Sequence, residues 1–398
     1  MRRIWVAGVL LAAFAAWAAG PAWAGHKEAV TFGGALSETG RYAEPAGRFK
    51  NSYVLFADQQ NAAGGVLGHK MELVLMDDKS DKQTSIKLYE KLITQDKVDF
   101  VLGPYSSDIT DAVANIIERY KYPMMAPGAS SRVIWEKGRK YIFNQSAVAQ
   151  DYQRGSLHRV KEIGVKRVAI IGADSLFSRQ SRDGAIAWAK RLGIQVVLVE
   201  DYPTKQTDFT ALLQKIKARG ADMIVSNSYF ADAVAQVRQL KELDINLKVF
   251  SGTVGPGLPK FATQLGPTAE YVLGFSQWEP KPEVIKTPGT KEFTDAYEKR
   301  FGVKPNYHAG IAYAAMQILT DGIKKAGTFD RQKVWQTLRG METSSILGRW
   351  KVDDAGMNDY EGLTFQILNG KRVIVWPPKF AEAKPTLPMP TWKARPTN

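Results

Sequence analysis

The chain has 398 residues, of which 44% are hydrophobic and 24% are charged, and these are ordinary values for a globular protein. It contains no cysteine, which excludes disulfides and a lipid-modified amino-terminal cysteine, and its formal net charge is +14. The basic residues are spread along predicted helix faces without a recognition-helix motif, so we expect a solvated basic surface and no nucleic-acid partner.

The amino-terminal residues have the order of a secretory signal peptide. Arg2 and Arg3 precede an apolar run over 4–19, and residues 22–24 (Ala-Trp-Ala) offer a small-x-small cleavage site. We expect a signal peptide over 1–24, a mature chain that starts at Gly25, and a periplasmic protein that is not a lipoprotein. Cleavage leaves 398 − 24 = 374 residues, enough for two domains, and no later run approaches the ~20 apolar residues of a membrane span.

Short apolar runs alternate with helical patterns through most of the remaining chain. This alternation predicts an α/β fold with parallel sheets and helices on both faces, in more units than one sheet holds. In chain order we expect strands at 29–37, 71–76, 98–102, 122–126, 141–144, 168–172, 195–200, 223–226 and 247–251, with helices at 46–62, 83–95, 108–120, 181–192, 209–219 and 231–243. The segment 376–398 has six prolines and no periodicity, and predicts an extended tail that is packed on a surface or mobile.

Two of the predicted strands run into serine-rich turns, Tyr105-Ser106-Ser107 and the segment 128–131 (Gly-Ala-Ser-Ser). A strand, a crossover helix and a second strand place both turns at one sheet edge, where open α/β sheets hold ligands. Hydroxyl groups and free backbone N–H groups at that edge suit a carboxylate. The alternative is that these serines only cap helices.

Motifs for catalysis or metal binding are missing from the sequence. There is no phosphate loop, dinucleotide fingerprint, zinc-protease motif or nucleophile elbow, and the four histidines are spread singly. The adjacent pair Asp77-Asp78 predicts a solvated turn after a strand, since neighbouring strand residues point to opposite faces. We therefore expect no enzyme activity, no metal and no cofactor.

The order of several segments resembles the leucine/isoleucine/valine-binding family of periplasmic solute receptors, the type I binding proteins of ABC importers. The matching segments are 33–40 (GGALSETG), 61–70 (NAAGGVLGHK), 75–78 (LMDD), 103–107 (GPYSS), 126–130 (APGAS), 208–212 (DFTAL) and 312–315 (AYAA). The resemblance covers residues 30–376 and implies two Rossmann-like lobes, joined by a three-segment hinge, with the ligand between them.

The resemblance also implies where the lobes divide. It places lobe 1 at 25–145 plus 278–355, lobe 2 at 146–277 plus 356–376, and the proline-rich tail at 377–398. The three crossings between the lobes are expected near 144–147, 274–277 and 354–362.

The site implied by the resemblance is a carboxylate-binding cleft with aromatic walls. Ser107 and Ser130 match the hydroxyl positions that hold a carboxylate, and Gly128 and Ala129 match the backbone groups beside them. The full set of expected ligand-binding residues is Tyr42, Tyr105, Ser106, Ser107, Gly128, Ala129, Ser130, Phe177, Tyr229, Val254 and His308, with Tyr307 as an alternative to His308.

One position departs from the family pattern. Amino-acid-binding members carry an acid that pairs with the ligand α-ammonium, and Val254 stands near that position. A buried ammonium without a partner costs several kcal/mol. Either Asp232 or Asp174 takes the role, or the ligand is an aromatic or aliphatic carboxylate without an ammonium.

The leading functional interpretation is a monomeric transport receptor that delivers an amino acid or organic acid to ABC permease subunits in the membrane. Within the same fold, a receptor for an aromatic or aliphatic acid or amide is the first alternative. A ligand-sensing regulator on the same fold is the second, and a periplasmic enzyme is disfavoured because no nucleophile with a base is found.

Overall fold

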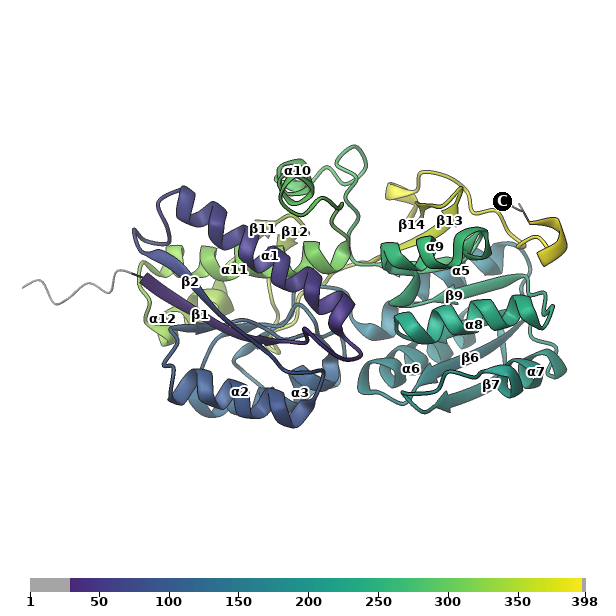
Figure 1. Ribbon diagram of the computed structural model, residues 1–398, viewed down its shortest axis with the longest axis horizontal. Helices are drawn as coiled ribbons and strands as arrows, with labels where there is room; N and C mark the ends of the chain where they lie inside the picture. Colours follow the sequence, from purple (N-terminus) through teal and green to yellow (C-terminus); the bar gives the residue numbers. More distant parts are fainter. Residues whose placement is uncertain (1–28, 396–398) are drawn as a thin grey trace, which may run out of the picture.

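The computed structural model describes residues 29–395, and the expected signal peptide lies outside the described residues. The chain forms two α/β lobes side by side, with segments of the chain running between them (Figure 1). The carboxyl-terminal segment runs over the lobe drawn at the right. The α/β class with parallel-dominated sheets is thereby confirmed.

The first lobe is built on a parallel sheet of order β2-β1-β3, and a short parallel pair, β4 and β5, lies beside it. Its core is closed by helices from the first and last thirds of the chain (Figure 1). The strands are β1 (Ala29–Leu36), β2 (Lys70–Asp77), β3 (Phe100–Val101), β4 (Met124–Met125) and β5 (Ile142–Phe143), with a β11 (Thr343–Ser345) and β12 (Gly348–Trp350) hairpin. The helices are α1 (Ala43–Ala62), α2 (Lys82–Thr94), α3 (Ser107–Tyr120), α4 (Val133–Glu136), α10 (Thr290–Phe301), α11 (Tyr307–Ala326) and α12 (Arg331–Gly340).

The second lobe is built on a seven-stranded sheet of order β14-β13-β10-β9-β8-β6-β7. Its strands β6 to β10 are parallel, whereas β13 and β14 run antiparallel at one edge. The strands are β6 (Arg167–Ala173), β7 (Gln195–Tyr202), β8 (Met223–Asn227), β9 (Val249–Gly252), β10 (Leu273–Ser276), β13 (Leu363–Leu368) and β14 (Lys371–Trp376). The helices are α5 (Arg154–Glu162), α6 (Leu176–Arg191), α7 (Thr210–Ala218), α8 (Phe230–Glu242) and α9 (Pro259–Leu265), with short 3₁₀ turns η1 (Ala149–Asp151), η2 (Gly255–Gly257) and η3 (Gly266–Ala269).

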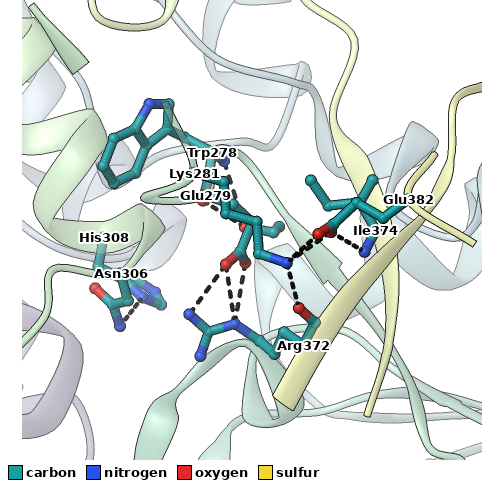
Figure 2. Close-up of polar contacts among 9 residues, drawn as sticks. Trp278, Glu279, Lys281, Asn306, His308, Arg372, Ile374 and Glu382 are labelled. Carbon is teal, nitrogen blue, oxygen red and sulfur yellow. Dashed lines mark hydrogen bonds and ion pairs between the residues drawn. The ribbon is translucent and has the colours of Figure 1, made fainter. Parts of the chain in front are cut away.

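The chain passes between the lobes three times, after β5, after β10 and after β12. The expected second crossing at 274–277 overlaps the end of β10, which continues to Ser276, so the chain leaves the strand at Gln277. The residues that follow Gln277 in this crossing form ion pairs with β14 and with the segment after it. Glu279 is buried and accepts from the Arg372 guanidinium at 3.0 Å, and Lys281 pairs with Glu382 at 2.6 Å (Figure 2).

The proline-rich tail is packed on the second lobe as far as residue 395, with two further 3₁₀ turns, η4 (Pro378–Phe380) and η5 (Trp392–Ala394). The Gln366 side chain holds both backbone groups of Thr386, accepting from its N–H at 2.7 Å and donating to its carbonyl at 3.0 Å. The Trp392 indole donates to the Ile245 carbonyl at 2.9 Å. Of the two expected arrangements, the structure has the packed one.

The expected solvated turn at Asp77-Asp78 is wrong for the second residue. Asp78 is fully buried, and its carboxylate accepts from the hydroxyls of Ser37 at 2.6 Å and Ser85 at 3.0 Å. These partners lie far from Asp78 or on the next helix, so local sequence does not reveal them. Asp78 thereby fixes the end of β1, from which the loop toward the cleft departs.

Candidate functional site

The two serine-rich turns lie side by side, and glycine makes the contact possible. Tyr105 and Gly128 form a parallel bridge between the segments that follow β3 and β4. A Cβ atom at Gly128 would lie 2.4 Å from the Pro104 carbonyl oxygen and 2.7 Å from Cα of Tyr105. No side chain fits there, so the close approach of the turns requires glycine.

Ser107 links the two turns and begins helix α3. Its Oγ accepts from the backbone N–H groups of Ser130 at 3.1 Å and Ser131 at 3.2 Å. Both lone pairs of the hydroxyl are therefore used, and its proton remains to be donated. The hydroxyl of Ser130 contacts the Tyr152 hydroxyl at 2.7 Å.

Ser106 and Ala129 support these turns from behind. Ser106 has φ of +87°, a strained conformation for a residue other than glycine, and its Oγ accepts from the Ile109 N–H at 3.2 Å as the cap of α3. Ala129 is fully buried. Neither residue lines the cavity described next. In the structure Ser106 caps helix α3 and Ala129 is packed in the core.

A cavity of about 20 Å³, close to the space that one water molecule needs, lies between the two lobes at the serine turns. A solute larger than this must enter through opening of the lobes or movement of side chains. The first lobe contributes Tyr105, Ser107, Pro127, Gly128, Ser130, Tyr307, His308 and Ile311, and the second lobe contributes Tyr152, Phe177, Tyr229 and Val254.

Eight of the eleven expected site residues line this cavity; Tyr42, Ser106 and Ala129 do not. Sequence reasoning missed Pro127, Tyr152 and Ile311. For Tyr152 a signal existed, because an aromatic residue directly after the first crossing is placed to face the cleft. Larger surface clefts, of about 380 and 420 Å³, lie at the hinge and beside α9, and neither contains a serine turn.

Aromatic rings form a continuous row across the boundary between the lobes. Tyr42, in the loop after β1, has its ring centroid 5.1 Å from that of Tyr229 in the second lobe. Tyr229 lies 5.7 Å from Phe177, which lies 5.1 Å from Tyr152. Tyr42 therefore covers the cleft from outside the cavity, and the row offers flat apolar surface to a ring.

Two polar contacts join the lobes beside this row. The guanidinium of Arg41 pairs with the Asp232 carboxylate at 3.2 Å and lies over the Tyr229 ring, 4.5 Å from its centroid. The backbone N–H of Leu176, at the start of α6, donates to Asp108 at 3.2 Å. These contacts hold the lobes together in this conformation.

The two acids considered as ammonium partners are both engaged elsewhere. Asp232 is held by Arg41, and Asp174 is largely exposed and pairs with Arg179. No aspartate or glutamate is among the described residues that line the cavity. The cavity therefore offers hydroxyl and aromatic groups but no carboxylate to an ammonium.

The titratable groups at the cavity are neutral. Burial lowers the pKa of His308 well below its usual value, and Arg48 and Arg372 add to this effect. Burial also raises the pKa of Tyr105, Tyr229 and Tyr307 well above the usual value for a phenol. The phenols thus keep their protons. Within 29–395, no group of three or more histidines, acids or cysteines is arranged to hold a metal ion.

We predict that Arg41→Ala shifts the lobes toward an open arrangement. The change leaves the buried Asp232 carboxylate without its cation, and opening restores water to it, which favours the open form by roughly 1 kcal/mol or more. Small-angle scattering should give a larger radius of gyration. Arg48→Ala is the control, because Arg48 pairs with Glu44 inside α1. Equal radii for the two variants would contradict a closing role for Arg41.

Comparison with known proteins identifies the class. Residues 29–361 match the family model described as "Periplasmic binding protein", and the chain belongs to this family. An amino acid binding protein of Pseudomonas aeruginosa is 26% identical over 342 residues, covering 83% of this chain and 88% of that protein.

Solved structures share the fold. The leucine binding protein LivK of Thermotoga maritima is 22% identical with a TM-score of 0.79, covering 87% of this chain and 97% of that chain. A solute binding protein of an ABC transporter from R. palustris, in complex with benzoate, is 18% identical with a TM-score of 0.78, covering 87% and 95%. Across residues 29–395, no helix has the length and apolar character needed to cross a bilayer.

Proposed function

We propose that this protein is the solute-binding component of an ABC importer and that it binds a small carboxylate between its lobes. The observation that carries the proposal is the cavity itself. It brings the Ser107 and Ser130 hydroxyls together with aromatic rings from both lobes, at the carboxyl ends of parallel strands. Membership of the periplasmic binding protein family supports the same role.

We further propose that the carboxylate lacks an α-ammonium group. No acid lines the cavity among the described residues, Val254 occupies part of its second-lobe wall, and Asp232 and Asp174 have cation partners. A benzoate complex of a protein with this fold supports an aromatic acid, whereas the names of other relatives support an amino acid. Because no aspartate or glutamate is among the described residues of the cavity wall, we favour a ligand that has a carboxylate and no ammonium group.

The proposal extends to location, partners and lobe boundaries. The receptor acts in the periplasm after export, as a monomer without catalytic activity, and delivers its solute to membrane permease subunits. The lobes divide at 25–145 plus 278–355 and 146–277 plus 356–376, with 377–398 as a tail. Closure of the lobes traps the solute, because the cavity has walls from both.

A thermal-shift screen tests the binding function. A solute that binds only the folded protein raises its stability by about 2.7 kcal/mol at a hundred times Kd, which gives a clear rise in Tm. The screen should contain amino acids and aromatic and aliphatic acids. We expect stabilisation by at least one acid that lacks an ammonium. Stabilisation by amino acids alone would contradict the proposed ligand class.

We predict export and cleavage after Ala24 when the full chain is expressed in a bacterium with a periplasm. The motivation is the basic, apolar and small-residue order of residues 2–24. Mass spectrometry of the periplasmic fraction should find Gly25 as the first residue. Intact Met1 in periplasmic protein would show that the segment is not a cleaved signal.

A further inference from the structure

Two buried amide side chains stand behind the cavity without lining it. Gln277 lies at the start of the second crossing, and Asn306 caps helix α11. Each amide is oriented by a backbone N–H group, which can only donate. The Ala147 N–H donates to Oε1 of Gln277 at 2.8 Å, and the Ala309 N–H donates to Oδ1 of Asn306 at 3.2 Å. Each NH₂ group is therefore the end that is left to donate to the groups nearer the cavity.

The amide of Gln277 occupies an acceptor site of one hydrogen-bond chain that leads to the cavity. Its Nε2 donates to the Tyr152 hydroxyl at 2.7 Å, and that hydroxyl contacts Oγ of Ser130 at 2.7 Å. A phenol is the stronger donor of the two hydroxyls, so Tyr152 donates to Ser130. The Ser130 proton is then left for the cavity. If the middle bond ran the other way, the Tyr152 proton would be left, so one hydroxyl donates into the cavity in either arrangement.

The amide of Asn306 sets the direction of a second chain. Its Nδ2 contacts Nδ1 of His308 at 3.4 Å (Figure 2). A neutral imidazole carries one N–H, and Nδ1 faces a donor, so the proton is on Nε2. Nε2 lies 3.1 Å from the Tyr105 hydroxyl and donates to it. The proton of Tyr105 is then also left to donate into the cavity.

We infer that Gln277 and Asn306 are positioning residues that make the Ser130 and Tyr105 hydroxyls donors, so that the cavity prefers a group that only accepts hydrogen bonds over one that also donates. A carboxylate can accept from both hydroxyls, whereas a primary amide or an ammonium presents N–H groups to hydroxyls that each already accept one hydrogen bond and still have a proton to place. The ligand in this inference is the one named in the proposed function. The roles of the two amides rest on the hydrogen bonds of Gln277 and Asn306.

Gln277 also connects the hydrogen-bond chain at the cavity to the three crossings between the lobes. Its side chain binds Ala147 in the first crossing, and its backbone carbonyl accepts from the Tyr360 hydroxyl in the third at 2.5 Å. One residue thus joins all three crossings and the donor chain. Tyr360→Phe removes a hinge contact of Gln277 while leaving its amide bonds in place, and it serves as a matched control.

The protonation of His308 can be measured without any ligand. Nitrogen-15 NMR of histidine-labelled protein distinguishes the two neutral tautomers, and His308→Gln assigns the signal. We expect the proton on Nε2 in the wild type and on Nδ1 in Asn306→Asp. The aspartate keeps an acceptor for the Ala309 N–H but replaces the NH₂ group with a second acceptor. A proton on Nδ1 in the wild type would overturn the second chain.

The selectivity is tested by calorimetry with 3-phenylpropionate and 3-phenylpropionamide as probes. We expect the wild type to prefer the acid, and Gln277→Glu to reduce the acid-to-amide ratio of affinities by roughly tenfold or more. Gln277→Met removes the donor without adding charge and frees an acceptor site on the Tyr152 oxygen for an amide N–H, so it should also lower the ratio, whereas Tyr360→Phe should leave the ratio unchanged.

The outcomes separate the two proposals. An unchanged ratio in Gln277→Met would overturn the role of the amide, even if Gln277→Glu has an effect through its charge. If the wild type binds neither probe nor any acid in the thermal-shift screen, the proposed function fails. The tautomer of His308 still decides whether the second donor chain, through Asn306, exists.

Discussion

Replacing Ser130 with alanine is expected to weaken binding of the carboxylate solute by roughly tenfold to a hundredfold. A hydrogen bond to a charged group contributes about 1.5–3 kcal/mol, which corresponds to that range of affinity. Among the described residues the Ser130 hydroxyl contacts only the Tyr152 hydroxyl, so Tyr152 is the one side chain that loses a hydrogen-bond partner within the protein. Calorimetry with the acid found in the thermal-shift screen measures the effect.

Ser107→Ala is expected to weaken binding at least as much. The substitution removes the Ser107 O–H donor. It also removes the Ser107 oxygen that accepts from the backbone N–H groups of Ser130 and Ser131 and thereby holds the second serine turn against the first. Ser52→Ala is the control, since this buried serine donates to the Ala309 carbonyl at 2.9 Å and does not line the cavity. Wild-type affinity in folded Ser107→Ala and Ser130→Ala would show that the carboxylate is held elsewhere.

The second large effect is expected at Val254. Val254→Glu places a carboxylate at the second-lobe wall of a cavity whose described lining contains no acid. It should give an α-ammonium a charged partner and repel an acid without one. We expect the ratio of affinities for an amino acid and its deaminated analogue to rise by roughly a hundredfold, as one charge-assisted bond is gained and one repulsion is added.

Val254→Gln separates charge from shape in this experiment. Glutamine has nearly the same size as glutamate but offers no negative charge, so it should leave the ratio close to that of the wild type. Calorimetry with leucine and 4-methylpentanoate measures both variants. Equal ratios for the glutamate and glutamine variants would mean that position 254 does not face the ligand substituent on the α-carbon.

Much of the fold could be predicted, because strands and helices of the second lobe have strong local patterns. The apolar run at 168–172 forms the centre of β6, and the helical spacing at 231–243 matches α8 within one residue. Boundaries were less well predicted where polar residues open a helix. Helix α6 begins at Leu176 rather than at 181, because Ser175 caps it and the polar run at 178–183 interrupts the helical apolar pattern.

The serine turns were predictable as neighbours because parallel βα units bring successive turns to one edge. The strands beneath them are only two residues long, however, and their contact depends on Gly128. Tyr152 and Gln277 were not predictable as partners of Ser130. They are separated by 125 residues and meet only when the crossings lie side by side, so no local pattern records their contact.

The central claim is that the cleft binds a carboxylate without an α-ammonium, and matched pairs test it most directly. Calorimetry on the wild-type protein should compare leucine with 4-methylpentanoate and phenylalanine with 3-phenylpropionate. Each pair differs in the ammonium, whose burial without a partner costs several kcal/mol. The account predicts tighter binding of the deaminated acid in each pair for which binding is measurable. Tighter binding of the amino acids would contradict it and would show that an acid pairs with the ammonium in the ligand-bound form.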